Sequence, residues 1–331
     1  MENILEEIAD GLYQIRIPLS FRLKYVHIFA ALLENRLTLF DTGPDLPSTS
    51  STLQNCLGQI GKSIYDIDRI FLTHFHVDHC GFAGRIKEMS GAVIHMSEID
   101  FATLRLCLEK HRRIGLIRSF YRSHGLEEAS IQAYERFIDA FNALTRPFTT
   151  ENFLVENEIL KVGKRNLRVL FTPGHTRGHV CFILPEEKIL IAGDNILPHI
   201  TPNLSPDFSL PSFLPLESYI HSLERIEFLP VKAVYPGHGL RFEDLRGRVK
   251  EIKEHHVQRK NLALHSLKED SKTVCEVSRD IFGDDLPDFD RVLALNETYV
   301  HLRQLEKEGL IESTRREDKF LYWRVWRVGK R

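Results

Sequence analysis

The sequence predicts an α/β fold, and two observations support this. Segments with the alternation of β-strands take turns with segments of helical periodicity along the first 245 residues. Histidine and aspartate residues follow directly after several predicted strands, where strand ends hold functional side chains in place. At 331 residues the chain exceeds the usual size of one domain, so we expect a large domain and a smaller one.

The N-terminal part reads as a β-meander that leads into alternating helices and strands. The D-T-G-P sequence at 41–44 predicts a turn, and a helix is expected over 48–60. An apolar run then predicts a buried strand that ends next to the segment 73–79. The predicted strands of this part cover 13–18, 25–33, 37–40 and 67–72.

The stretch 97–154 differs from its surroundings, because Leu, Ile and Phe recur in it at helical spacing. We interpret it as a helical insertion that could act as a lid. A proline-rich loop is expected over 195–216, bordering the functional site. Strands return around this loop, and they are predicted over 167–171, 180–184, 188–192 and 232–235.

The C-terminal part has the outline of a winged helix. A long helix over 245–267 is followed by helices over 274–281 and 293–309 and by a hairpin over 311–328. We therefore expect a catalytic domain over 1–245 and a linker helix with a small winged-helix-like domain over 246–331.

Composition excludes several classes of protein. The formal net charge is -2 and the pI is about 6.8, so no overall field draws the chain to nucleic acid or to an anionic membrane. No apolar stretch reaches the roughly 18 to 20 residues of a membrane span, and the acidic N-terminus is unlike a signal peptide. The five scattered cysteines are typical of a reducing compartment. We expect a soluble, cytoplasmic protein.

The T-H-F-H-V-D-H sequence at 73–79 is the strongest candidate for a functional site. On an extended segment, His74 and His76 point the same way, and a following turn can direct Asp78 and His79 to a second point. One short loop could then serve two metal ions. Neutral imidazole with some carboxylate is the ligand mixture that zinc favours, whereas calcium and magnesium prefer oxygen.

Two histidines fill only part of a tetrahedral shell, so this hypothesis requires further ligands downstream. P-G-H-T offers His175, A-G-D offers Asp194 and P-G-H-G offers His238, each after a predicted strand. A buried-histidine interpretation without metal does not explain this density and order.

The order of these motifs resembles the metallo-β-lactamase superfamily over residues 10–245. The resemblance implies an αβ/βα sandwich with two divalent metal ions at one edge, zinc being favoured and iron or manganese being alternatives. It implies that one ion is held by His74, His76 and His175 and the other by Asp78, His79 and His238, with Asp194 bridging them. Asp41 of the D-T-G turn resembles an acid that orients ligands.

The resemblance also implies a mechanism. A metal-bridging hydroxide would attack the substrate, while Asp78 holds the second metal and accepts a hydrogen bond from the hydroxide. Flavodiiron-type oxidoreductases resemble this pattern but carry Glu where this chain has His76, so hydrolysis is favoured. Iron-dependent persulfide dioxygenases use the His form and stay an alternative.

Candidates for substrate contacts are less distinct. His199 follows Asp194 in the proline-rich loop, and Arg118 and Tyr121 belong to the helical insertion with Arg122 and His124. A solvated helix face is the preferred interpretation of the insertion residues. His179 follows His175 by four positions, and it could support a ligand or equally be a core or surface histidine. Cys80 directly follows His79, and a small buried thiol is its simpler interpretation.

The substrate class remains open between two alternatives. A long helical lid favours a small-molecule thioester, lactone or related ester, as in glyoxalase-II-like proteins. The alternative is a metal-dependent endoribonuclease or phosphodiesterase, since the C-terminal region also resembles that of lactamase-like endoribonucleases. Basic and aromatic residues of the tail are the one candidate nucleic-acid surface, namely Arg315, Arg316, Lys319, Tyr322, Trp323, Arg324, Trp326, Arg327, Lys330 and Arg331. A homodimer is also possible.

Overall fold

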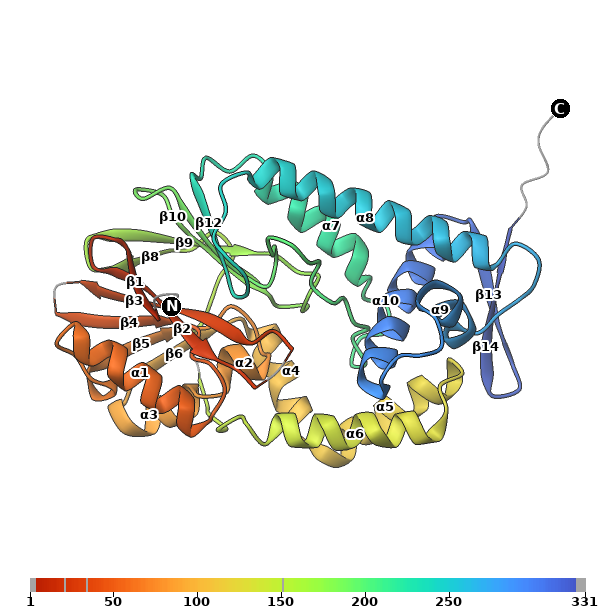
Figure 1. The fold of residues 1–331 in the computed structure, drawn as a ribbon, viewed down its shortest axis with the longest axis horizontal. Helices are drawn as coiled ribbons and strands as arrows, with labels where there is room; N and C mark the ends of the chain where they lie inside the picture. Colours follow the sequence, from red (N-terminus) through yellow and green to blue (C-terminus); the bar gives the residue numbers. More distant parts are fainter. Residues whose placement is uncertain (1–3, 21, 34, 151, 326–331) are drawn as a thin grey trace.

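The fold is known from a computed structural model that describes residues 4–325 except 21, 34 and 151. Two β-sheets pack face to face with helices on both outer faces, and a group of helices with a hairpin lies at one end (Figure 1). The predicted αβ/βα sandwich is therefore confirmed.

The first sheet has seven strands that lie in the order of the sequence. The first four are antiparallel, and the remaining neighbours are parallel, so connecting helices cross over the outer face. Its strands are β1 (Leu5–Ala9), β2 (Leu12–Pro18), β3 (Tyr25–Leu33), β4 (Arg36–Phe40), β5 (Ile67–Phe71), β6 (Val93–Met96) and β7 (Asn152–Phe153).

The second sheet has five strands in the order β12-β11-β10-β9-β8. Strands β8 to β11 are antiparallel, and β12 joins β11 in parallel. They are β8 (Ile159–Val162), β9 (Arg165–Phe171), β10 (Val180–Leu184), β11 (Ile189–Gly193) and β12 (Ala233–Pro236).

Aromatic side chains fill the space between the two sheets. Phe40 and Phe71 are partners on neighbouring strands of the first sheet, and the ring of Phe182 on β10 lies 5.4 Å and 5.8 Å from theirs. All three rings are completely buried. Edge and offset contacts of this kind add to the free energy of apolar burial. The contact holds the sheets together, so that the C-terminal ends of β5, β11 and β12 meet at one edge.

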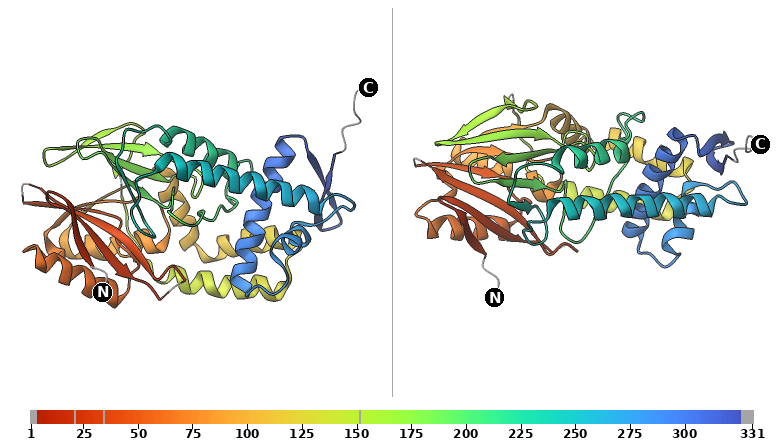
Figure 2. Two further views of the ribbon diagram at one scale, coloured as in Figure 1. Left: turned by 45° about the horizontal axis from the view of Figure 1, so that its top comes forward. Right: turned by 90° about the horizontal axis from the view of Figure 1, so that it is seen from above.

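Helices cover the outer face of each sheet. Leu53 and Leu57 of α1 and Ile86 of α3 pack on the first sheet, and Leu223 of α7 and Val249 of α8 pack on the second. Helices α7 and α8 run side by side (Figure 2). These helices are α1 (Pro47–Gln59), α3 (Ala83–Ser90), α7 (Pro215–Ile226) and α8 (Leu245–Ser266), and a short 3-10 helix η1 (Ile64–Asp66) precedes β5.

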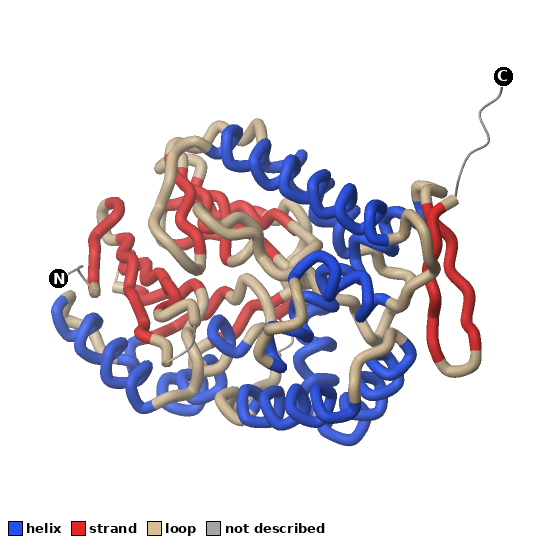
Figure 3. Tube along the Cα trace, turned by 45° about the vertical axis from the view of Figure 1, so that its right-hand side comes forward, coloured by secondary structure: helices blue, strands red, loops and turns tan. Residues whose placement is uncertain are grey.

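The stretch interpreted as an insertion forms three helices and ends in strand β7 of the first sheet. The first helix buries Leu104 against the first sheet, and the other two pack against the C-terminal part. Helix α6 contacts α10, and α5 contacts β14. The hairpin of β13 and β14 stands apart from both sheets (Figure 3). The elements of this region are α4 (Glu98–Leu108), α5 (Lys110–Ser123), α6 (Glu128–Asn142), α9 (Val274–Phe282), α10 (Asp288–Lys307), β13 (Ile311–Arg316) and β14 (Lys319–Arg324). The observed order of helix, helix and hairpin agrees with the predicted outline, while the domain boundary, the winged-helix assignment and the lid stay predictions.

The predicted proline-rich loop is correct except at its end. Pro215 begins helix α7, because a proline in the first turn lacks only an N–H that would have no partner inside the helix. The sequence pattern predicts no strand at β1, β6, β7 or β8, which lie at sheet edges or are short. Among the described residues, no helix is both long and apolar enough to cross a lipid bilayer.

Two helical glycines make a matched pair for testing how closely the elements pack. A Cβ atom added to Gly84 of α3 would lie 2.7 Å from the carbonyl oxygen of Pro147, whereas one added to Gly58 of α1 meets nothing within 4 Å. We expect Gly84→Ala to lower the free energy of unfolding by about 1 to 3 kcal/mol through overpacking. Gly58→Ala should raise it by roughly 0.5 to 1 kcal/mol. Urea denaturation of both variants measures this, and an unchanged or raised stability of Gly84→Ala would contradict the packing.

Candidate metal centre

The histidine-rich segment lies between the end of β5 and helix α2 (Val77–Cys80), which is a single turn. His74 and His76 precede this turn, and Asp78 and His79 lie within it. The backbone is held from both sides, because the N–H of Val180 donates to the Thr73 carbonyl oxygen and the N–H of Thr42 donates to that of His79. The predicted division of the loop into an extended part and a turn is therefore correct.

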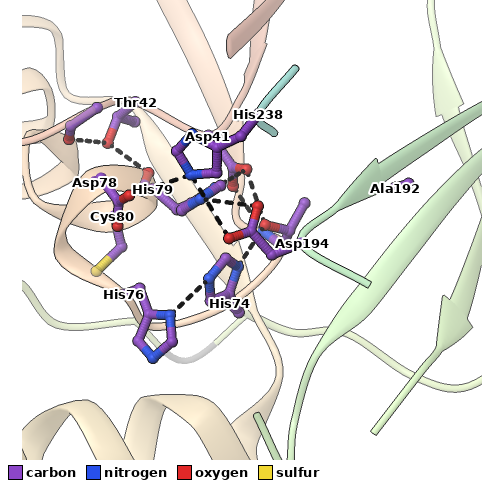
Figure 4. A network of polar contacts seen from close by, with 12 residues as sticks. Asp41, Thr42, His74, His76, Asp78, His79, Cys80, Ala192, Asp194 and His238 are labelled. Atoms are coloured by element: carbon purple, nitrogen blue, oxygen red, sulfur yellow. Dashed lines mark hydrogen bonds and ion pairs between the residues drawn. The ribbon is translucent and has the colours of Figure 1, made fainter. Parts of the chain in front are cut away.

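The other three predicted ligands arrive from the second sheet. His175 lies between β9 and β10, Asp194 follows β11 and His238 follows β12. The N–H of Gly237 donates to the Gly193 carbonyl oxygen at 2.7 Å, which joins the last two loops. Figure 4 shows His74, His76, Asp78, His79, Asp194 and His238 gathered around one point.

The cluster contains three overlapping groups that could hold a metal ion, each with ligand atoms within 4.8 Å of one another. They are His74, His76 and His175; His74, His79 and Asp194; and Asp78, His79 and His238.

Asp194 lies between the groups. Its Oδ2 is 3.8 Å from His175 Nε2 and 3.6 Å from His238 Nε2, and its Oδ1 is 3.4 Å from His79 Nε2. A carboxylate in this position can contact two cations at once.

Three buried atoms of the cluster lack a well-formed hydrogen bond, namely His79 Nε2, Asp194 Oδ1 and His238 Nε2. They make only longer ion-pair contacts, His79 Nε2 with Asp194 Oδ1 at 3.4 Å and His238 Nε2 with Asp78 Oδ2 at 3.3 Å. Burying a polar atom without a partner is unfavourable by about 1 to 3 kcal/mol. Bound cations would satisfy all three atoms, so the donor set fits a metal site. Imidazoles in the majority and carboxylates in the minority suit zinc and similar borderline ions better than calcium or magnesium.

The protonation states of one half of the cluster favour metal binding. Burial, followed by the neighbouring imidazoles, lowers the pKa of His74 well below its usual value. Burial and the nearby His175 lower the pKa of His76 to about 3, and burial also lowers the pKa of His175. These three imidazoles are therefore neutral near pH 7, which is the form that binds a cation.

The other half of the cluster is held together by charge. Burial opposes ionisation, but Asp194 and Asp41 raise the pKa of His79 well above its usual value, and Asp194 and Asp78 raise that of His238. Burial likewise opposes ionisation of Asp78, yet the 3.3 Å ion pair with His238 and the charge of His79 lower its pKa to about 2. The protons on His79 and His238 thus balance the negative charge of the carboxylates. Bound cations could take over this role, and metal binding would then release these protons.

The far sides of the rings are anchored. His79 Nδ1 lies 2.8 Å from Asp41 Oδ2, His175 Nδ1 lies 2.9 Å from the Asn203 carbonyl oxygen, and His238 Nδ1 lies 2.7 Å from that of Tyr25. Such partners fix which ring nitrogen carries the proton and leave the other free for a metal. Asp41 occupies the place expected of an orienting acid, with its backbone in the left-handed region at φ 59°.

The family model of the metallo-β-lactamase superfamily matches residues 25–238, which is more than half of the chain. The chain belongs to the metallo-β-lactamase superfamily.

Solved structures of this superfamily have the same fold along almost the whole chain. A metallo-β-lactamase family protein from Thermus thermophilus has a TM-score of 0.85 at 29% identity, covering 96% of this chain and 100% of that protein. A β-lactamase domain protein from Burkholderia ambifaria also reaches 0.85, at 23% identity, covering 97% of this chain and 94% of that protein. The likeness therefore includes the helical insertion and the C-terminal helices.

Curated relatives extend the comparison to named proteins. "Beta-lactamase-like protein 2 homolog" of Caenorhabditis elegans is 26% identical over 313 residues, covering 93% of this chain and 88% of that protein. "Atrochrysone carboxyl ACP thioesterase" of Aspergillus fumigatus is 26% identical over 213 residues, covering 63% of this chain and 51% of that protein. Superfamily membership and the likeness to a thioesterase identify the chain as a hydrolase, as the sequence predicted.

Asp100 belongs to no predicted motif of the superfamily, yet it ties two of the ligand-bearing loops together. Its carboxylate is completely buried and accepts hydrogen bonds from the Thr176 hydroxyl at 2.7 Å, from the Gly178 N–H at 2.7 Å and from the Phe75 N–H at 3.2 Å. Phe75 lies between His74 and His76 in the sequence. The S-x-x-D sequence at 97–100 marks a helix start, but it carries no sign of these distant contacts.

His179 and Cys80 also support the loops. His179 Nε2 accepts a hydrogen bond from the Asp194 N–H at 3.2 Å, and its Nδ1 lies 2.8 Å from the Thr172 hydroxyl. Cys80 Sγ donates to the Phe75 carbonyl oxygen. Both side chains have partners within the protein, and the contact of His179 with the Asp194 backbone fits the alternative in which it supports a predicted ligand.

The predicted substrate contacts belong to none of the three metal-ligating groups. Tyr121 is completely buried and donates its hydroxyl to Asn296, and Arg118 forms two hydrogen bonds with Glu135. His199 is exposed on the proline-rich loop. Contact of these residues with substrate stays a prediction. Arg122 pairs with Glu128, and His124 is buried between Phe120 and Phe320, which favours the packing interpretation for these two.

Asp100→Ala tests whether the two loops depend on this carboxylate. The change leaves the N–H groups of Phe75 and Gly178 without a partner, so we expect the affinity for zinc to fall by roughly 10- to 100-fold, as for other groups that orient ligands. Titration against a competing chelator measures the affinity. Asp68→Ala is the control. That carboxylate, on β5, accepts one backbone N–H, from Leu37 of the neighbouring strand β4. Equal losses in both variants would contradict a specific role of Asp100.

Proposed function

We propose that the chain is a dinuclear metal-dependent hydrolase that cleaves a small-molecule thioester, lactone or related ester. The observation that carries the proposal is the overlap of the ligand groups, in which His74 and His79 are each shared. His74, His76 and His175 would hold one ion, and Asp78, His79 and His238 the other, with Asp194 between them. Zinc is the metal that we propose, and iron and manganese are the alternatives.

When bound, the two ions would polarise the substrate carbonyl and lower the pKa of the attacking water. The side chains of this chain would orient the reactants. Asp78 is ionised at neutral pH and about 8% exposed, so it can accept a hydrogen bond from the attacking water. Its role in this proposal is to align the attacking water. Tyr25, Asn203 and Asp41 hold the imidazoles in place.

A thioester heads the proposed substrates because a relative matching 63% of this chain is named a thioesterase. The five cysteines are free thiols, which supports the proposal of a cytoplasmic location. The homodimer stays a prediction.

The alternative of an endoribonuclease rests on the basic hairpin. Arg315, Arg316 and Lys319 are exposed there, but the hairpin lies at the opposite end of the molecule from the N-terminal sheet (Figure 1). Trp326, Arg327, Lys330 and Arg331 of the same predicted surface lie outside the described residues. A polymer would have to span this distance, so a small substrate is favoured.

Metal-ligand variants test the proposal against a panel of thioester, lactone, phosphodiester and RNA substrates. We expect His76→Ala and Asp194→Ala to lose bound metal and to reduce thioester or lactone hydrolysis by about a thousandfold or more. His111→Ala, which alters an exposed histidine of α5, should leave both unchanged. Full activity of metal-stripped protein would refute the metal-dependent mechanism. Cleavage of RNA alone would replace the proposed substrate class with the alternative.

A further inference from the structure

A chain of hydrogen bonds leads from His175 to the helices at the far end of the molecule. His175 Nδ1 lies 2.9 Å from the Asn203 carbonyl oxygen. The Asn203 side-chain amide donates to the Leu293 carbonyl oxygen of α10 at 3.3 Å, and its oxygen accepts from the Ser205 hydroxyl at 2.9 Å. The connection therefore leaves the metal-ligating cluster through the proline-rich loop.

The same chain continues into α10 and α5. The Asn296 side-chain amide donates to the Ser205 hydroxyl oxygen at 3.2 Å, and the Tyr121 hydroxyl donates to the Asn296 side-chain oxygen at 2.9 Å. Each of these groups acts as donor to the next and acceptor from the one before. The bonds thus run in a single direction from Tyr121 to the backbone of α10, with no conflict between donors.

The loop that carries Asn203 and Ser205 needs such support. Residues 195–214 contain no helix or strand, so few of their backbone groups are fixed by regular hydrogen bonds. By contrast, Asn296 and Tyr121 are almost completely buried. Buried polar groups with full sets of partners are rigid and specify one arrangement. The rigid end of the chain of bonds is therefore in the helices, and the adaptable end is at the metal-ligating cluster.

We propose that Asn203, Ser205, Asn296 and Tyr121 form a positioning network through which helices α5 and α10 set the orientation of His175. The network holds the Asn203 carbonyl oxygen in place, and that oxygen fixes the ring of His175 with Nε2 toward His76 and Asp194. This inference rests on the metal-ligand role given to His175 in the proposed function. It gives the C-terminal helices a part in catalysis without direct contact with substrate.

Ser205→Ala breaks the network in the middle while removing only one hydroxyl group. In the cobalt-loaded full chain we expect cobalt affinity to fall by roughly tenfold, the low end for groups that orient metal-bound histidines. The visible absorption bands, which report ligand geometry, should shift as well. In the metal-free chain, amide hydrogen exchange over 195–214 should rise by roughly fivefold, the factor for one lost hydrogen bond. Tyr121→Phe removes the hydroxyl at the other end and should change the same readouts in the same direction.

Two further variants separate positioning from general packing. Ser205→Thr keeps the hydroxyl and should retain the wild-type absorption bands. Thr298→Val removes a buried hydroxyl of α10 whose hydrogen bond stays within the helix, to the Ala294 carbonyl oxygen, and should leave cobalt binding and loop exchange unchanged.

Unchanged bands and unchanged exchange in both Ser205→Ala and Tyr121→Phe would overturn the network. Equal effects in Thr298→Val would also overturn it, because they would trace the change to the packing of α10. If the wild-type chain takes up no cobalt, the proposed function fails instead. The exchange measurement then decides by itself whether the network holds the loop.

Discussion

Charge balance in a small buried space is the constraint on which the rest of the structure depends. Five imidazoles and two carboxylates converge at one edge of the sandwich, with Asp194 in contact with histidines of both halves. Isolated charges are expensive to bury, so each carboxylate must be matched by protons or by cations. The surrounding side chains keep these charged groups in place. Asp41, Asp100 and His179 each form a hydrogen bond with a candidate ligand or with the backbone next to one.

The sandwich supplies the rigidity that such a site requires. Contact of Phe182 with Phe40 and Phe71 joins the two sheets, and loops from both sheets then supply ligands to the same point. Neither sheet could form the cluster by itself, because His74, His76, Asp78 and His79 come from the first sheet and His175, Asp194 and His238 from the second. The site therefore forms only when the two sheets pack in the correct position relative to each other.

The candidate ligands that the structure brings together lie in short motifs directly after strands, where local pattern and spacing carry the information. The strands over 25–33 and 180–184 were equally clear, since their side chains are apolar and mostly buried. What the sequence left out depends on distant contacts. Asp100 has only the local pattern of a helix start, and the hydrogen bond between Tyr121 and Asn296 joins positions 175 residues apart. The partners of Arg118 and Tyr121 in other helices, Glu135 and Asn296, cannot be seen in the local pattern either.

The packing of the insertion on the C-terminal helices decides where this enzyme could be truncated and which of its segments could be exchanged with those of a homologue. Ile117, Tyr121, Leu126 and Ile131 share one apolar cluster with Val292, Leu295 and Tyr322. A chain cut after residue 245 would leave the first group uncovered, and uncovered apolar surface of this kind promotes aggregation. Segments exchanged between homologues would accordingly have to carry helices α5 and α6 together with α9, α10 and the hairpin, because these elements cover one another's apolar side chains although they lie far apart in the sequence.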